Sequence, residues 1–266
     1  SRLRHCCHDS PSARMNLLSD RPADPVFLGV TLILCAIAGV IASAWCIHID
    51  DVINNDGVEY IRAAEQLAAR NWAGAFAVHQ WPFFSFLMWG TSAVLGTSYE
   101  VAGQLLNAFF FTASSLLFVG VVRVFGGTSQ RLTVLAALVA VLHPSFNEYR
   151  AFIIRDAGYL AFYLLALFCL ARSIQTTSLR YPAGVVAALL VASLFRIEGA
   201  VFLLSAPLLI LTVRGKNGGS PWNRLVLTIV SAAVLALVLG WWLIAPNGGI
   251  TADAAATTPW EVVSTA

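Results

Sequence analysis

Charged side chains are scarce in this sequence. Only 11% of the residues are Asp, Glu, Lys or Arg, whereas 58% are hydrophobic and the mean hydropathy is +0.76. Soluble domains carry about 25% charged residues, so this chain has too few charges to cover a surface that faces water. The net charge of +2 and the lack of a long basic run exclude a nucleic-acid partner. The composition predicts an integral membrane protein.

Cysteines are too few and too dispersed to form a disulfide framework. Cys35, Cys46 and Cys169 lie within apolar segments, where a small soft side chain is ordinary packing material. The His-Cys-Cys-His cluster at residues 5–8 lacks the spacing of a zinc module, because adjacent ligands do not easily surround one tetrahedral centre. The sequence therefore predicts no zinc module at this cluster.

Long apolar segments recur along the chain. A helix needs about 20 apolar residues to cross the hydrocarbon core, and seven segments approach that length: 25–47, 101–125, 132–146, 157–171, 182–195, 199–213 and 225–245. Segment 81–95 is short and begins with aromatic residues, which predicts an interfacial or re-entrant helix. We expect an all-α, polytopic integral membrane protein with about seven transmembrane helices, plus amphipathic or re-entrant helices in the first extracytoplasmic loop.

Basic residues indicate the orientation of these spans. With a cytoplasmic N-terminus, most of them fall in cytoplasmic segments, namely the N-terminal tail and loops 123–131, 172–180 and 214–224. Counting 81–95 as a full crossing would move these basic loops outside. We therefore expect a multi-pass protein of the cell (inner or plasma) membrane with its N-terminus in the cytoplasm.

The chain divides into three expected regions. Residues 1–24 form a cytoplasmic tail, 25–245 the transmembrane module, and 246–266 an extracytoplasmic tail or a truncated loop. Because Met15 is the first methionine, we expect residues 1–14 to be either translated upstream sequence or an artefact of gene calling that is not native.

The first expected outside loop carries Asp50, Asp51 and Asp56. Asp56 precedes a segment in which Tyr60 and Ala64 share one apolar face, which predicts an amphipathic helix on the membrane surface. An aspartate before a helix is most often a cap, so Asp56 has a structural interpretation beside a catalytic one.

Glu148, Arg150, Arg155 and Asp156 form the second expected outside loop, between two apolar segments. They could neutralise one another as Glu148–Arg150 and Arg155–Asp156 ion pairs. Alternatively, the planar donor fork of each arginine suits it to hold a phosphate.

The tight Arg196-Ile-Glu198 link joins two further apolar segments. Arginine at that depth either extends its charged end toward water or binds an anionic headgroup.

Several of these motifs occur in a definite order. They are an N-terminal anchor, Asp56-Gly-Val-Glu-Tyr60 with Ala64 following, Trp81-Pro82 before a stretch closing at Leu95-Gly96, His143-Pro144, Arg155-Asp156 and Arg196-Ile-Glu198-Gly199. This order resembles the polyprenyl-phosphate-dependent membrane glycosyltransferases of the C-type fold, especially the protein mannosyltransferases and aminoarabinose transferases. The similarity covers residues 25–245 and rests on the order of the elements. Members of that family usually continue into further helices, so the resemblance implies a C-terminally truncated or minimal member.

The resemblance implies an enzyme that lies in membrane lipid, takes a sugar from a polyprenyl-phosphate donor and transfers it to an acceptor hydroxyl. Asp56 would be the general base, with Asp50 and Asp51 as alternatives. The implied substrate- and phosphate-binding residues are Tyr60, Glu148, Arg155, Asp156, Arg196 and Glu198. Glu148 or Asp156 would orient the substrate or, in a metal-dependent relative, bind a divalent cation. His79 is expected to be an interfacial surface residue.

Two other classes of function compete with this interpretation. A membrane transporter or lipid flippase would also carry ionisable residues beside short helices, but its signature is an inverted repeat, and the acidic residues here gather on one side instead. A non-catalytic assembly subunit would tolerate replacement of every outside acid.

Overall fold

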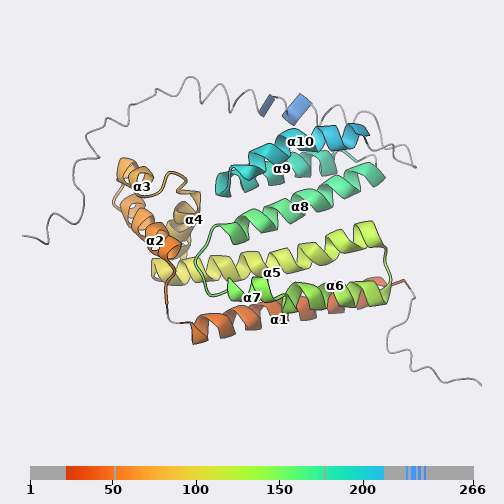
Figure 1. The fold of residues 1–266 in the computed structure, drawn as a ribbon, viewed down its shortest axis with the longest axis horizontal. Helices are drawn as coiled ribbons and strands as arrows, with labels where there is room; N and C mark the ends of the chain where they lie inside the picture. The colour runs from red at the N-terminus through yellow and green to blue at the C-terminus, as the bar shows by residue number, and fades with distance from the viewer. Residues whose placement is uncertain are drawn as a thin grey trace, which may run out of the picture.

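The computed structural model describes residues 22–50, 52–176 and 178–212, together with isolated positions between 226 and 237. Every named element in these residues is an α-helix, and the β contact that they contain is a bridge between Pro22 and Ser129 (Figure 1). The predicted all-α class is confirmed. Segment 1–21, Asp51, most of the expected crossing 225–245 and the tail 246–266 lie outside the described residues.

Within the described part of the chain, three helices are long and apolar enough to cross a membrane: α1 (Pro25–Ile49), α5 (Tyr99–Gly126) and α8 (Asp156–Gln175). At 1.5 Å per residue, even a 20-residue helix spans roughly the 30 Å of a hydrocarbon core. Much of α1 exposes large apolar side chains, including Ile33, Ile41 and Trp45. Because water would not favour such a surface, these helices indicate an integral membrane protein.

Three shorter apolar helices lie beside the long ones: α6 (Gln130–Leu142), α9 (Arg180–Phe195) and α10 (Glu198–Thr212). The helices α1, α5, α6, α8, α9 and α10 begin alternately at the two ends of the molecule (Figure 1). α5 contacts α1, α6 and α8, and α9 packs between α8 and α10.

The sequence predicted one continuous apolar span over residues 132–146, but the structure has two helices there. α6 ends at Leu142, and the short helix α7 (Pro144–Glu148) follows after His143. His143 is extended, with φ −62° and ψ 122°. The residue before a proline is sterically disfavoured in the helical conformation, which explains the break.

Helix ends coincide with capping residues. The side chains of Asp24, Ser98 and Ser129 accept hydrogen bonds from backbone N–H groups in the first turns of α1, α5 and α6. Gly96 follows α4 (Phe83–Leu95) in the left-handed conformation at φ 68°, which glycine adopts without a steric penalty.

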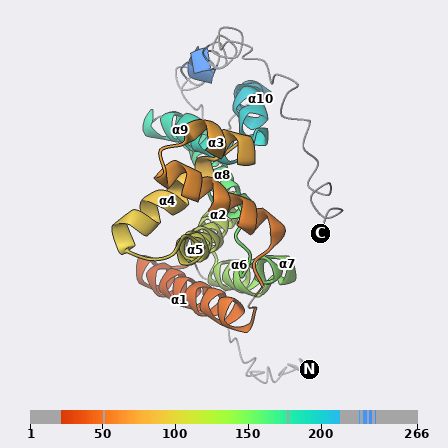
Figure 2. The same ribbon diagram turned by 90° about the vertical axis from the view of Figure 1, so that its left-hand side faces the viewer.

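Helices α2 (Asn55–Ala68), α3 (Trp72–Val78) and α4 gather at one end of the bundle (Figures 1 and 2). α4 corresponds to the expected segment 81–95, and it lies with α2 at that end. A buried cluster joins this group to the long helices through Tyr60, Phe84, Phe110 and Phe195. The end group is therefore packed onto the bundle.

The start of α2 differs from the expectation that Asp56 precedes it. The helix begins at Asn55, so Asp56 lies in its first turn and Asn54 occupies the capping position. The Asn54 side chain forms no capping hydrogen bond to α2. It donates to the carbonyl of Ile153 at 3.3 Å and accepts from the N–H of Ile153 at 2.9 Å. This pair ties the start of α2 to the loop before α8.

Candidate functional site

Arg196 lies at the centre of an ion-pair network at the bundle end that carries α2–α4. It follows α9 in an extended conformation, and its Nη1 is 2.6 Å from the Oδ1 of Asp156. Nη2 and Nε reach the two carboxylate oxygens of Glu198, at 2.7 and 3.2 Å. The hydrogen bonds that Arg196 donates to Glu198 and, second, to Asp156 raise the pKa of Arg196 above its usual value. Arg196 thus stays charged and oriented.

Two glycines bring this network together. A Cβ atom on Gly199 would overlap the backbone of Ala192 and Ser193, so the absence of a side chain lets α10 start against the end of α9. A Cβ atom on Gly158 would overlap the ring of Phe195. The starts of α8 and α10 consequently converge on the end of α9, where Arg196 is located.

Arg155 contacts His79, which lies 76 positions earlier in the sequence. Arg155 Nη1 lies 3.2 Å from His79 Nε2, and His79 Nδ1 lies 3.5 Å from a carboxylate oxygen of Glu59. The ring of Tyr60 packs edge-on against His79, with 4.9 Å between the centroids. The His79 side chain is only 18% exposed, so it is a partly buried residue of the pocket lining and not freely exposed.

These surroundings change two pKa values. Burial, followed by the charge of Arg155, lowers the pKa of His79, although Glu59 and Asp56 act in the opposite direction. Burial also raises the pKa of Tyr60 to about 12, with Arg155 opposing and Asp56 adding to the shift. At neutral pH the site therefore holds a neutral imidazole and a protonated phenol beside charged arginine residues.

An open pocket of about 580 Å³ lies over these residues, and its lining includes His79, Arg155, Arg196 and Glu198. Gln80 and Trp81 are shared with a second pocket of about 330 Å³. Its other lining residues are Leu67, Trp72, Phe76, Pro82, Phe83, Phe86 and Leu194. A charged chamber thus adjoins an apolar one, and together they suit a ligand with an anionic head and a hydrocarbon tail.

The loop that presents Arg155 is held by a buried arginine. Arg150 is fully buried and donates to the carbonyl of Gly39 and the hydroxyl of Ser43, at 3.1 and 2.9 Å. Its Nε donates to Asn147 at 2.9 Å. The expected Glu148–Arg150 and Arg155–Asp156 pairs do not form, because Arg150 binds α1, Arg155 binds His79 and Asp156 binds Arg196.

The structure brings four expected site residues to one place: Arg155, Asp156, Arg196 and Glu198. Asp56 is an exposed residue in the first turn of α2, close enough for its charge to act on His79 and Tyr60. Tyr60 itself is only 2% exposed and packs behind His79. The tyrosine therefore supports the site from within the core.

The other candidates lie apart from this arrangement. Glu148 is exposed on α7 and does not line either pocket. The Asp50 side chain accepts a hydrogen bond from the backbone of Val52 at 3.2 Å, after the end of α1. Asp51 is outside the described residues. Within the described part of the chain, no three His, Cys, Asp or Glu residues group closely enough to hold a metal ion.

Sequence reasoning missed His79 and Glu59. The signal for Glu59 was its place next to Tyr60, within the motif that carries the resemblance. No spacing rule connects His79 with Arg155, because their contact depends on how α3 and the start of α8 are placed in space.

Comparison with protein-family models, with curated proteins and with solved structures found no match.

Proposed function

We propose that this chain is a membrane glycosyltransferase that moves a sugar from a polyprenyl-phosphate donor to an acceptor hydroxyl on the extracytoplasmic face. The observation that carries the proposal is the pair of adjoining chambers at residues 79–81, one charged and one apolar. A polyprenyl phosphate has the matching chemistry, since its phosphate suits Arg155 and Arg196 and its hydrocarbon chain suits Trp72 and Phe76.

Both arginine residues would bind the phosphate, each with N–H donors that the protein leaves available. Among the described residues, Arg155 forms one side-chain hydrogen bond, to His79, and so has further N–H donors for a phosphate oxygen. Arg196 is already oriented by its hydrogen bonds to two carboxylates, so its remaining N–H donors would bind the phosphate without reorientation. As the bond between the sugar and the phosphate breaks, both would stabilise the negative charge on the departing polyprenyl phosphate.

The acceptor would be activated by a carboxylate of α2. The acceptor oxygen attacks the anomeric carbon, its proton passes to the Asp56 carboxylate, and the phosphate oxygen leaves with its electron pair. The exposure of Asp56 leaves it accessible to an incoming hydroxyl. Asp50 is the alternative base among the described residues.

A topology of seven crossings with a cytoplasmic N-terminus accompanies this proposal. The alternating directions of the six described bundle helices support it (Figure 1). So does the position of Arg123 and Arg172 in the last turns of α5 and α8, at the end opposite the site.

The test is an assay of sugar transfer by the detergent-purified chain from a panel of polyprenyl-phosphate sugars. Asp56→Asn is expected to abolish turnover while donor binding persists. Glu65→Gln is the matched control, because Glu65 is an exposed carboxylate of the same helix, and this variant is expected to keep full turnover.

Other results would redirect the proposal. Equal turnover by Asp56→Asn and the unmodified chain would reject Asp56 as the base and lead to Asp50→Asn. If the unmodified chain transfers no sugar but moves labelled lipid phosphate across proteoliposomes, it is a flippase and the proposal fails.

A further inference from the structure

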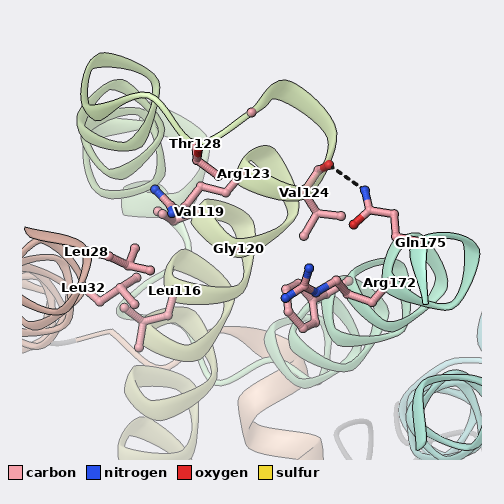
Figure 3. Close-up of a pocket in the computed structure, with 12 residues that line it drawn as sticks. Leu28, Leu32, Leu116, Val119, Gly120, Arg123, Val124, Thr128, Arg172 and Gln175 are labelled. Atoms are coloured by element: carbon pink, nitrogen blue, oxygen red, sulfur yellow. Dashed lines mark hydrogen bonds between the residues drawn. The ribbon is translucent and has the colours of Figure 1, made fainter. Parts of the chain in front are cut away.

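A second amphipathic cavity lies at the end of the bundle opposite the candidate site. It has a volume of about 570 Å³, and α5 forms its floor at Gly120 between α1 and α8 (Figure 3). Leu28, Leu32 and Leu116 lie on the side of α1 (Figure 3). Phe168, which also lines the cavity, belongs to α8. The cavity therefore has apolar walls within a part of the protein that faces lipid.

Two arginine residues give this cavity a positive charge. Arg123 is in the last turn of α5 and Arg172 in the last turn of α8, and both line the cavity. Its lining contains no carboxylate, and no ion pair is formed by either arginine within the described residues. Among the described residues, no acidic side chain of the lining therefore balances this positive charge.

Arg172 has unused hydrogen-bonding capacity. Its buried Nε has no hydrogen-bond partner within the described residues. The guanidinium carbon lies 5.9 Å from the ring centroid of Phe168 and 6.0 Å from that of Tyr181. Arg123, by contrast, donates from Nη1 to Thr133 at 2.6 Å, which fixes its direction. Gln175 is held by its amide to the Val124 carbonyl at 3.1 Å (Figure 3).

A structural role accounts for only part of this arrangement. A cation in the last turn of a helix interacts favourably with the helix dipole, which would explain each arginine separately. It does not explain why both line one cavity with apolar walls. A partly buried guanidinium without a counter-charge is costly, and an anionic ligand in the cavity would supply that counter-charge.

We propose that this cavity binds the phosphate headgroup of an anionic membrane lipid, with an acyl chain against Leu28 and Leu32. Phosphate oxygens accept hydrogen bonds from Arg172, Arg123 on the other side of α5 adds positive charge (Figure 3), and the leucines of α1 cover the first part of the chain. Basic pockets between transmembrane helices bind such headgroups through the same chemistry. This site is separate from the candidate catalytic pocket and does not depend on the proposed function.

The experiment is native mass spectrometry of the detergent-purified full chain, titrated with phosphatidylglycerol and, separately, with phosphatidylcholine of the same acyl chains. Saturable binding that prefers phosphatidylglycerol is expected. Arg172→Gln and Arg123→Gln should each weaken that binding about ten-fold, as expected for loss of a charged hydrogen bond. Arg180→Gln is the matched control, since Arg180 lies outside the cavity, is exposed and bonds to Tyr181. It should change binding by less than about two-fold, as for an exposed charge.

Two results would overturn the proposal. Equal binding of both lipids, or equal weakening by Arg180→Gln and Arg172→Gln, would show that no headgroup site exists here. Complete displacement of phosphatidylglycerol by inorganic phosphate at equal concentration would show a free-phosphate site instead of a lipid site. Arg172→Lys, which keeps the charge, guards against misfolding, and it should bind more tightly than Arg172→Gln.

Discussion

The contact between Arg155 and His79 determines which imidazole nitrogen carries the proton. A guanidinium only donates hydrogen bonds, so His79 Nε2, 3.2 Å from Arg155 Nη1, has to be the acceptor. The proton of the neutral ring is therefore on Nδ1, which faces Glu59 at 3.5 Å. Protonation of Nε2 would place two donors against each other, in agreement with the lowered pKa of His79.

This arrangement predicts that acidification destabilises the fold through His79. A lowered folded-state pKa means that the unfolded chain binds more protons, so the contribution is complete above the unfolded value of about 6.5 and is lost as pH falls below it. Thermal unfolding at pH 7.5 and 5.5 should show a larger fall in Tm for the unmodified chain than for His79→Gln. Equal falls in the two proteins would contradict the assignment.

Arg196→Lys should impair donor use while changing stability little. Lysine keeps the charge but lacks the planar fork that binds Asp156 and Glu198 together. The donor KM is expected to rise about ten-fold. Unfolding free energy should fall by less than about 1 kcal/mol, because the side chains are a third to a half exposed. Arg62→Lys, an exposed change on α2, should leave both values unchanged.

Gly158→Ala should destabilise the bundle. The added methyl group overlaps the ring of Phe195, which is only 1% exposed and cannot move freely. Such overpacking costs about 1–3 kcal/mol, and denaturant or thermal unfolding in detergent measures it. Gly29→Ala is the control, since no atom lies near its added methyl group. That variant should be neutral or stabilising by up to about 1 kcal/mol. A similar loss in both variants would refute the close approach at Gly158.

Arg150→Ala should be the most destabilising of these changes. It removes three hydrogen bonds and leaves a cavity where a side chain is fully buried. The expected cost is about 2–5 kcal/mol, measured by the same unfolding assay, with a smaller cost for Arg150→Lys. Arg62→Ala, at an exposed position, should cost less than about 0.5 kcal/mol. If Arg150→Ala is equally mild, Arg150 does not hold the loop.

The sequence was sufficient for the long helices but not for their contacts. The apolar segments that became α1, α5 and α8 are predictable because apolar length and the scarcity of charge are local properties. The break at His143 was also readable from Pro144, although the expected segment ran through it. The placement of Arg155 and Arg196 at the same end of the bundle followed from the same local pattern.

The pairing of these charges could not be read from local sequence. Asp156 and Arg196 are 40 positions apart, and they meet because Gly158 lets Phe195 approach α8. Neighbouring charges such as Arg155 and Asp156 looked like natural partners, yet each binds a residue from another element. Tertiary packing decides such contacts, and a single sequence does not encode it in any short pattern.

The bonds from Arg150 to α1 have a consequence for how the protein is assembled. Gly39 and Ser43 are synthesised more than a hundred residues before their partner. During synthesis, α1 therefore lacks these two hydrogen bonds until the segment after α7 has been made. A nascent chain whose α1 is lost or wrongly inserted would leave Arg150 Nη1 without its two acceptors, at an energetic cost. Correct placement of α1 is thereby a condition for holding the loop that presents Arg155.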